Sequence, residues 1–276
     1  VQFPLEKGSR KVYNYSTMKQ KILVILGPTA SGKSDLAVRL AKKFKGEIIS
    51  ADSRQVYRGL DIGTGKITKK EMRGVPHHLI DVANPKKYFS AAEYKKLAQK
   101  KLNKIDLAIV VGGTGFYIDA LTGVVPLPDV PPNKKLRERL GKKSNNDLVK
   151  LLRQKDPKRA KTIDINNKVR LIRALEIVEA LGKVPNVKHR VFDNKFVYIG
   201  LKPNDLDKRI RTRLIKRLEP MIREGRKLHE QGLTYKRMHE LGLEYRYLAL
   251  FLQGQISKEE MFEKLNTAIR QYARRQ

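Results

Sequence analysis

The sequence has 276 residues, no cysteine and no long apolar run. Without cysteine the chain cannot form a disulfide scaffold, a cysteine-ligated zinc finger, an iron–sulfur cluster or a thiol nucleophile. No segment approaches the roughly 18 consecutive apolar residues of a membrane span, and the N-terminus lacks the apolar core of a secretory signal. We therefore expect a soluble, cytoplasmic protein, with a monomer as the default.

Acidic residues are also scarce, because 28 Asp and Glu stand against 60 Lys and Arg and give a formal net charge of +32. An apolar share of 40% at this length is enough to bury a core, which excludes a wholly disordered polycation. The positive charge indicates a polyanionic partner, with nucleic acid as the first candidate and an anionic membrane as the second. The alternative is a lysine-rich surface typical of a basic proteome.

Residues 1–17 differ from the rest because they are mixed in character and aperiodic. We expect them to be a leader added to the natural protein, which would then start at Met18, just before a strongly apolar strand. This segment is left out of the predicted fold.

Short apolar runs alternate with helical patterns in the first half of the chain. Strands are predicted at 21–26, 47–51 and 107–111, each a continuous buried-type run. Apolar residues at helical spacing predict a helix over 36–44, and Ser90 with Glu93 forms a capping-box pattern that opens another helix. This alternation predicts an α/β fold with a parallel sheet flanked by helices.

The composition of the chain changes after Val124, where four prolines from 126 to 132 make a stiff connector. A charged, helical stretch follows, then a strand at 197–201 and helices from Leu206 onward. We predict a P-loop nucleoside-triphosphate-hydrolase-like core over 18–125 and 191–276, interrupted by a helical insertion domain over 126–190.

The first predicted strand is followed by a sequence that fits G-x-x-x-x-G-K-[ST] at every fixed position. In this pattern backbone N–H groups surround a phosphate at a helix N-terminus, the lysine approaches the terminal phosphate and the final hydroxyl binds Mg²⁺. A glycine turn without a ligand is the alternative, but the position between a strand and a helix favours phosphate binding. The predicted diphosphate-binding residues are Gly27, Pro28, Thr29, Ala30, Ser31, Gly32, Lys33 and Ser34, with Ser34 as the metal ligand.

Two more polar loops follow predicted strands, one beginning at Asp52 and one at Gly112–Thr114. The carboxyl ends of parallel strands share one edge of the sheet, so these loops should meet the phosphate loop there. Asp52 is the only carboxylate directly after a strand at that edge, which favours a general base or metal partner over a turn aspartate. A basic helix near 209–217 is either a solvated face or a surface toward RNA.

Several blocks of sequence together resemble the tRNA dimethylallyltransferase family, also called tRNA isopentenyltransferases, in its bacterial form. The resemblance runs in order from Lys21 onward. The blocks are Gly27–Ser34, Ser50–Tyr57, Asp61–Lys66, His77–Asp81, Val111–Tyr117, Arg170–Glu176 and Ala273–Gln276. The sequence departs from the family in a short linker at Asn103–Asp106, a brief segment at Gly182–Asp193, and the absence of the aromatic, basic segment that normally follows Gln276. We expect the last departure, through truncation or disorder, to weaken tRNA binding.

The resemblance implies that N6 of adenosine 37, next to the anticodon, attacks dimethylallyl diphosphate and releases diphosphate. The phosphate loop with Lys33 and Mg²⁺ would then hold the leaving group, Asp52 would accept the proton from N6, and Thr114 would lie near both substrates. The resemblance also implies a set of tRNA-binding residues, which are Asp52, Ser53, Arg54, Gln55, Thr114, Arg137, Arg170, Arg173, Tyr245 and Arg246.

Three other functions are alternatives to this one. An adenylate isopentenyltransferase, which prenylates free AMP, ADP or ATP, would not need a large basic insertion. A P-loop kinase for a small metabolite would explain the phosphate loop but not the segments around Asp52 and Thr114. A non-catalytic RNA-binding protein would have no use for an intact phosphate loop.

Overall fold

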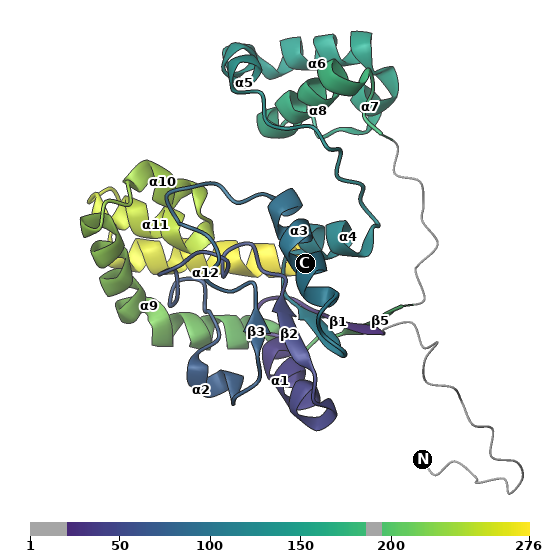
Figure 1. Ribbon diagram of the computed structural model, residues 1–276. Coiled ribbons are helices and arrows are strands. Elements are labelled where there is room, and N and C mark those ends of the chain that lie inside the picture. Colours follow the sequence, from purple (N-terminus) through teal and green to yellow (C-terminus); the bar gives the residue numbers. More distant parts are fainter. Residues whose placement is uncertain (1–20, 186–194) are drawn as a thin grey trace, which may run out of the picture. The chain divides into compact units, whose positions relative to one another are not determined.

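The computed structural model describes residues 21–185 and 195–276, which form two compact units (Figure 1). The first unit contains residues 21–88, Ala98–Thr114 and 195–276, and the second contains Phe89–Leu97 and 115–185. The expected leader at 1–17 and the expected start at Met18 lie outside the described residues.

The first unit is built on a five-stranded sheet in which every pair of neighbouring strands is parallel, in the order β3-β2-β4-β1-β5. The strands are β1 (Ile22–Leu26), β2 (Glu47–Ser50), β3 (His77–His78), β4 (Ala108–Val111) and β5 (Phe196–Gly200). The predicted parallel α/β core is therefore confirmed, whereas the two-residue strand β3 was not predicted. Its sequence, two histidines, carries no strand signal.

The described residues form twelve helices. They are α1 (Lys33–Phe44), α2 (Lys69–Met72), α3 (Ala91–Leu102), α4 (Gly115–Thr122), α5 (Lys134–Gly141), α6 (Asn145–Lys155), α7 (Pro157–Thr162), α8 (Lys168–Leu181), α9 (Leu206–Glu230), α10 (Tyr235–Glu240), α11 (Leu243–Leu252) and α12 (Lys258–Arg275). The predicted capping box of α3 is present, because Ser90 and Glu93 exchange hydrogen bonds between side chain and backbone. Among the helices of residues 21–185 and 195–276, none combines the length and the apolar composition that a membrane-spanning segment requires.

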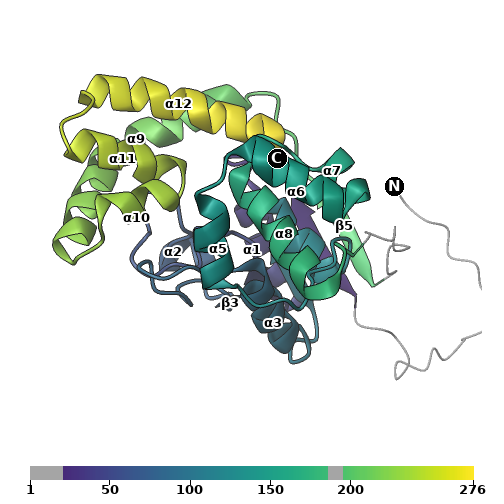
Figure 2. The same cartoon turned by 90° about the horizontal axis from the view of Figure 1, so that it is seen from above.

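Helix α1 closes the core of the first unit, since its Ala37, Val38 and Ala41 pack against Ile48 and Ile109 of the sheet. Helices α9 to α12 form a separate helical layer of the same unit (Figure 2). Apolar residues every three or four positions bury one side of these long helices. The layer brings α9, α11 and the end of α12 to the carboxyl edge of the sheet, as the contacts below show.

The second unit contains a helical core of its own, made by apolar residues of α5, α6, α7 and α8. Leu148, Leu152 and Leu171 are fully buried there. Glu176 of α8 is also buried, with 2% of its surface exposed, so its charge needs partners inside the unit. The unit includes residues 89–97 and 115–125 in addition to part of the predicted insertion, and the boundaries 126–190 stay a prediction.

Candidate active site

The phosphate loop joins β1 to α1 in a tight turn. Gly32 caps α1 in the left-handed region, with φ of 90°, where a side chain would be strained. Ser31 N–H donates to the carbonyl of Pro28 at 3.2 Å, which closes the turn. The ammonium of Lys33 donates to the same carbonyl at 3.0 Å and so lies over the loop. This is the geometry that the glycine pattern predicts for an anion site at a helix N-terminus.

Lys33 is the charged centre of this loop. Burial lowers the pKa of its ammonium from 10.5 to about 8, while nearby Asp52 raises the pKa and Arg213 lowers it further. Lys33 and Asp52 also line the same cavity. A carboxylate and the phosphate-loop lysine therefore face one space, as the order of strands predicts.

Asp52 begins the loop after β2. Its Oδ1 accepts hydrogen bonds from the backbone N–H groups of Arg54 at 2.8 Å and Gln55 at 3.3 Å. Both bonds use one oxygen, so among the described residues the other oxygen, Oδ2, has no hydrogen-bond donor within reach. The aspartate is thus a turn residue, and it retains a carboxylate oxygen that can accept a proton from a ligand.

The loop after β4 lies directly against the loop after β2. A Cβ on Gly112 would overlap the carbonyl of Ala51, so only glycine allows this approach. Thr114 N–H donates to that carbonyl at 3.1 Å, and Thr114 Oγ1 accepts from Ser53 N–H at 2.9 Å. The predicted meeting of these polar loops is confirmed.

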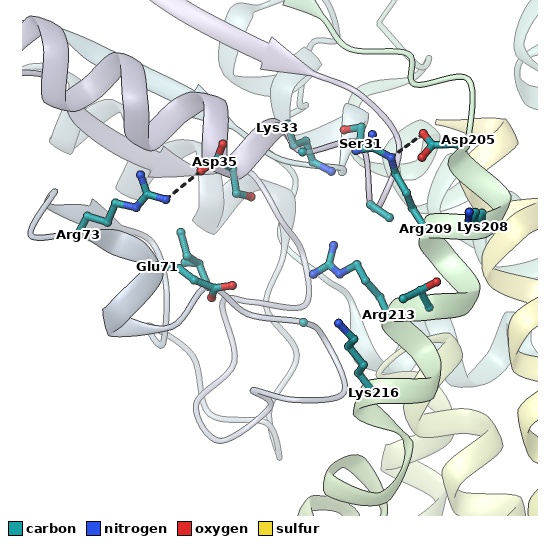
Figure 3. A pocket seen from close by; sticks show the side chains of 16 residues that line it. Ser31, Lys33, Asp35, Glu71, Arg73, Asp205, Lys208, Arg209, Arg213 and Lys216 are labelled. Carbon is teal, nitrogen blue, oxygen red and sulfur yellow. Dashed lines mark hydrogen bonds and ion pairs between the residues drawn. The ribbon is translucent and has the colours of Figure 1, made fainter.

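Helix α9 adds two cationic residues that sequence analysis did not assign to this site. Arg213 and Lys33 both extend into a cleft of about 620 Å³ between the start of α1 and α9 (Figure 3). Arg217 lines the neighbouring cavity with Asp52, and its Nη1 donates to the carbonyl of Ile62 at 3.2 Å. The predicted basic helix is therefore a wall of the pocket. The spacing of Arg209, Arg213 and Arg217, four residues apart, is the signal that placed them on one face.

Glu244 of α11 is a second acidic residue of the site, beside Asp52, and sequence analysis did not assign it. It lines the cavities that also contain Lys33 and Asp52. Burial raises the pKa of Glu244, and the opposite charge of Arg217 works against that rise. The resemblance implies tRNA contact for the stretch 241–246 as a whole, but no local pattern singles out Glu244, which reaches the sheet edge from a distant helix.

The loop over 61–66 forms another wall of the site, and Glu224 accepts hydrogen bonds from its backbone. The carboxylate of Glu224 accepts hydrogen bonds from the N–H groups of Asp61 at 2.9 Å, Ile62 at 2.7 Å and Gly63 at 3.0 Å. The hydroxyl of Tyr245 donates to the same carboxylate at 2.6 Å, and only 1% of Tyr245 is exposed. Tyr245 is thus a packing residue of this wall. The side chain of Tyr245 is too buried to reach tRNA as predicted. Its neighbour Arg246 is exposed and lines the cavity.

The three arginines predicted to bind tRNA in the second unit have different surroundings. Arg137 forms a bidentate pair with buried Glu176, at 2.8 and 2.7 Å, and Arg173 pairs with the same carboxylate and donates to the carbonyl of Val130 at 2.9 Å. Arg170 has a side chain that is 65% exposed and only a loose 4.0 Å pair with Asp164. Arg137 and Arg173 are thus both paired with Glu176, and Arg170 has the most exposed side chain of the three.

The residues available to a metal ion are few. In the described ranges, no group of three His, Asp or Glu side chains is placed to hold one. Ser34 lines the phosphate cavity beside Lys33. Mg²⁺ commonly takes one or two protein oxygens and completes its shell with substrate phosphate and water, so one hydroxyl beside a phosphate loop fits that ion.

Comparison with known proteins agrees with this geometry. Residues 55–276 match the family model described as IPP transferase. The chain is 40% identical over 269 residues to tRNA dimethylallyltransferase 1 of Geotalea uraniireducens, covering 94% of this chain and 87% of that protein. The chain belongs to the IPP transferase family. A relative from Treponema denticola, tRNA dimethylallyltransferase 2, is 42% identical, and the match covers 94% of this chain and 90% of that protein.

Solved structures of the IPP transferase family have the same fold. The tRNA isopentenylpyrophosphate transferase of Bacillus halodurans is 37% identical, with a TM-score of 0.67 over 94% of this chain and 86% of that one. A eukaryotic dimethylallyltransferase described as acting on tRNA is 28% identical, with a TM-score of 0.80 over 93% of this chain and 69% of that one. The predicted family is confirmed.

Proposed function

We propose that this IPP transferase family member transfers a dimethylallyl group from dimethylallyl diphosphate to N6 of adenosine 37 in tRNA and releases diphosphate. The observation that carries the proposal is that Lys33 and Asp52 line the same cavity, so a cation that would bind diphosphate and a carboxylate that would accept a proton border one space. The relatives' names supply the chemical class, and the pocket supplies the groups that this class of reaction needs.

The phosphate loop would bind the diphosphate of the donor. Its backbone N–H groups and the N-terminus of α1 favour an anion, and Lys33 and Arg213 add positive charge from two sides. Ser34 would hold Mg²⁺ against the diphosphate, and the ion would supply charge neutralisation for the leaving group. Because negative charge grows on the diphosphate as the C–O bond breaks, cations fixed at this place lower the barrier.

Asp52 would act as the general base. The adenine N6 lone pair forms a bond to C1 of the dimethylallyl group while the C1–O bond breaks, and one N6 proton passes to a carboxylate oxygen of Asp52. The turn fixes Asp52 through Oδ1 and leaves Oδ2 for that proton. Thr114, bonded to Ser53 beside Asp52, would help to hold the adenine in place.

The acceptor would enter as an unstacked base. An adenine in a folded anticodon arm is stacked, so it must leave the stack to reach a pocket between loops. Arg54, Gln55 and Arg246 line the cavities beside Asp52 and would contact the base or its phosphates. The net charge of +32 suits a tRNA substrate, and Arg170 is the exposed candidate contact in the second unit. We propose a cytoplasmic monomer.

A transfer assay with three acceptors tests this function. The protein is incubated with Mg²⁺ and labelled dimethylallyl diphosphate, together with unmodified tRNA in one arm and free AMP in another. A third arm contains labelled ATP and candidate metabolites. We expect label in tRNA alone. Label in AMP would indicate an adenylate isopentenyltransferase, and phosphate transfer from ATP would indicate a kinase.

A further inference from the structure

Gln276, the C-cap residue of α12, is hydrogen-bonded to two loops of the site. Its Oε1 accepts a hydrogen bond of 2.7 Å from the backbone N–H of Thr29 in the phosphate loop. Its Nε2 donates a hydrogen bond of 2.6 Å to the carbonyl of Gly113 in the loop after β4. A single carboxamide thus bridges residues that are 247 and 163 positions away in the sequence.

The surroundings are shaped around this side chain. A Cβ on Gly113 would lie 2.4 Å from Nε2 of Gln276, so a larger residue at 113 would displace the carboxamide from this position. Tyr272, one helical turn earlier on α12, lines the same cavity as Asp52, and burial raises the pKa of its hydroxyl, with the negative charge of Asp52 raising it further. The end of α12 is therefore part of the cavity wall.

Only an amide fits both hydrogen bonds. The N–H of Thr29 needs an acceptor and the carbonyl of Gly113 needs a donor, which a carboxamide supplies from its two ends. A glutamate at 276 would accept from Thr29 but place its second oxygen against the carbonyl of Gly113. A leucine of similar size would make neither bond.

We propose that Gln276 is a positioning residue that fixes the diphosphate-binding loop relative to the loop carrying Thr114. The inference rests on the proposed function, in which the first loop holds the donor and Thr114 lies beside the acceptor base. Donor and acceptor must align for the transfer, and a misplacement on the order of 1 Å costs up to roughly a hundredfold in rate. The carboxamide holds that alignment without touching either reacting atom.

The test compares Gln276→Leu with a matched variant, Gln271→Leu, on the same exposed stretch of α12. Gln271 lines a shallow surface depression with Tyr247 and Lys264 instead of the site. For Gln276→Leu we expect kcat to fall about tenfold, with the KM for tRNA changed less than about twofold. Hydrogen exchange at the amide of Thr29 should become faster by about tenfold, because that amide loses its acceptor. Gln271→Leu should match wild type in both measurements.

Each other outcome overturns the proposal. A Gln276→Leu protein with wild-type kcat and wild-type exchange at Thr29 shows that the bridge positions nothing. Tighter binding of inorganic diphosphate by this variant shows that Gln276 blocks the loop instead of ordering it. Gln276→Glu with wild-type kcat shows that the bond to Gly113 is dispensable. If wild type itself transfers no dimethylallyl group, the proposed function fails, and the exchange rate at Thr29 still tests the bridge.

Discussion

The backbone N–H of Ser53 donates a hydrogen bond of 2.9 Å to Oγ1 of Thr114 and so joins the loop after β2 to the loop after β4. The threonine hydroxyl in turn donates to Oγ of Ser53 at 3.2 Å. These bonds hold Asp52, the residue before Ser53, against the strand edge where the phosphate loop lies. The position of the proposed base therefore depends on Thr114, which is 61 positions from Ser53 in the sequence.

Replacing Thr114 with valine removes the hydroxyl and keeps the shape of the side chain. The N–H of Ser53 then loses its acceptor, and the loops separate or shift. We expect kcat to fall about tenfold, which corresponds to one net hydrogen bond of roughly 1 kcal/mol or slightly more. Thr114→Ser keeps the hydroxyl and should stay near wild type in a steady-state transfer assay. Equal activity of the two variants would show that the bond does not matter.

Asp52→Asn separates the two roles of the aspartate. The amide oxygen can still accept from Arg54 and Gln55, so the turn survives, but the side chain no longer accepts a proton. We expect kcat to fall by about 10² to 10⁴ while tRNA affinity is retained, measured by single-turnover transfer and by filter binding. Asp106→Asn, at an exposed position before β4, serves as the control. A near-wild-type rate for Asp52→Asn would exclude this residue as the base.

The lowered pKa of Lys33 predicts a pH dependence of donor binding. Below about pH 8 the ammonium is charged in the free protein, and it loses its proton as the pH rises through about 8. Bound diphosphate favours the charged form, so binding weakens as the pH rises. Calorimetry with Mg²⁺ and inorganic diphosphate should show the affinity advantage of wild type over Lys33→Met shrinking roughly tenfold between about pH 7 and about pH 9. A constant advantage would contradict the assignment.

The second unit should depend on the pairing of Glu176. Burial alone would raise the pKa of this carboxyl, but hydrogen bonds from Arg137 and Arg173 outweigh it and lower the pKa from 4.5 to about 2. Its folded-state stabilisation is therefore complete above about pH 4.5 and is lost as the pH falls toward about 2. Arg137→Ala should lower the free energy of unfolding by about 1–3 kcal/mol and start acid unfolding at a higher pH.

Arg139→Ala is the control for that stability measurement. Arg139 lies on the same helix and makes an exposed 3.6 Å pair with Glu179, which is worth little. Thermal and acid unfolding followed by circular dichroism should leave it within about 0.5 kcal/mol of wild type. If both variants unfold alike, the pairs with Glu176 do not hold the unit.

Binding of tRNA should weaken steeply with salt, because phosphate contacts release counterions. Each contact contributes a slope of about −0.7 to −0.9 in a plot of log affinity against log salt concentration. Arg170→Ala should make that slope less steep by the contribution of one contact, about 0.7 to 0.9. The melting temperature should stay unchanged, since the side chain of Arg170 is 65% exposed. Filter binding over a series of salt concentrations measures the slope. An affinity for tRNA that does not change with salt would argue against a surface that binds phosphates.

The sequence predicted the parts of the site that short-range chemistry determines. The phosphate loop, Asp52 and Thr114 each follow a strand, and the strand edge of a parallel sheet brings them together. Arg217, Glu244 and Gln276 come from helices of the C-terminal layer, and their approach depends on tertiary packing that no local pattern encodes. Glu176 is a further example, since the resemblance implies tRNA contact for Arg137 and Arg173, and no sequence pattern showed that both pair with this buried carboxylate.

The most direct measurement is the stoichiometry of the two products. The protein is incubated with Mg²⁺, dimethylallyl diphosphate and unmodified tRNA. Released diphosphate is measured enzymatically, and the modified nucleoside is measured by mass spectrometry. We predict one diphosphate released for each N6-dimethylallyladenosine formed at position 37, with both products lost in Lys33→Met. Phosphate released from ATP, with no dimethylallyl group in the tRNA, would contradict the assignment of the pocket.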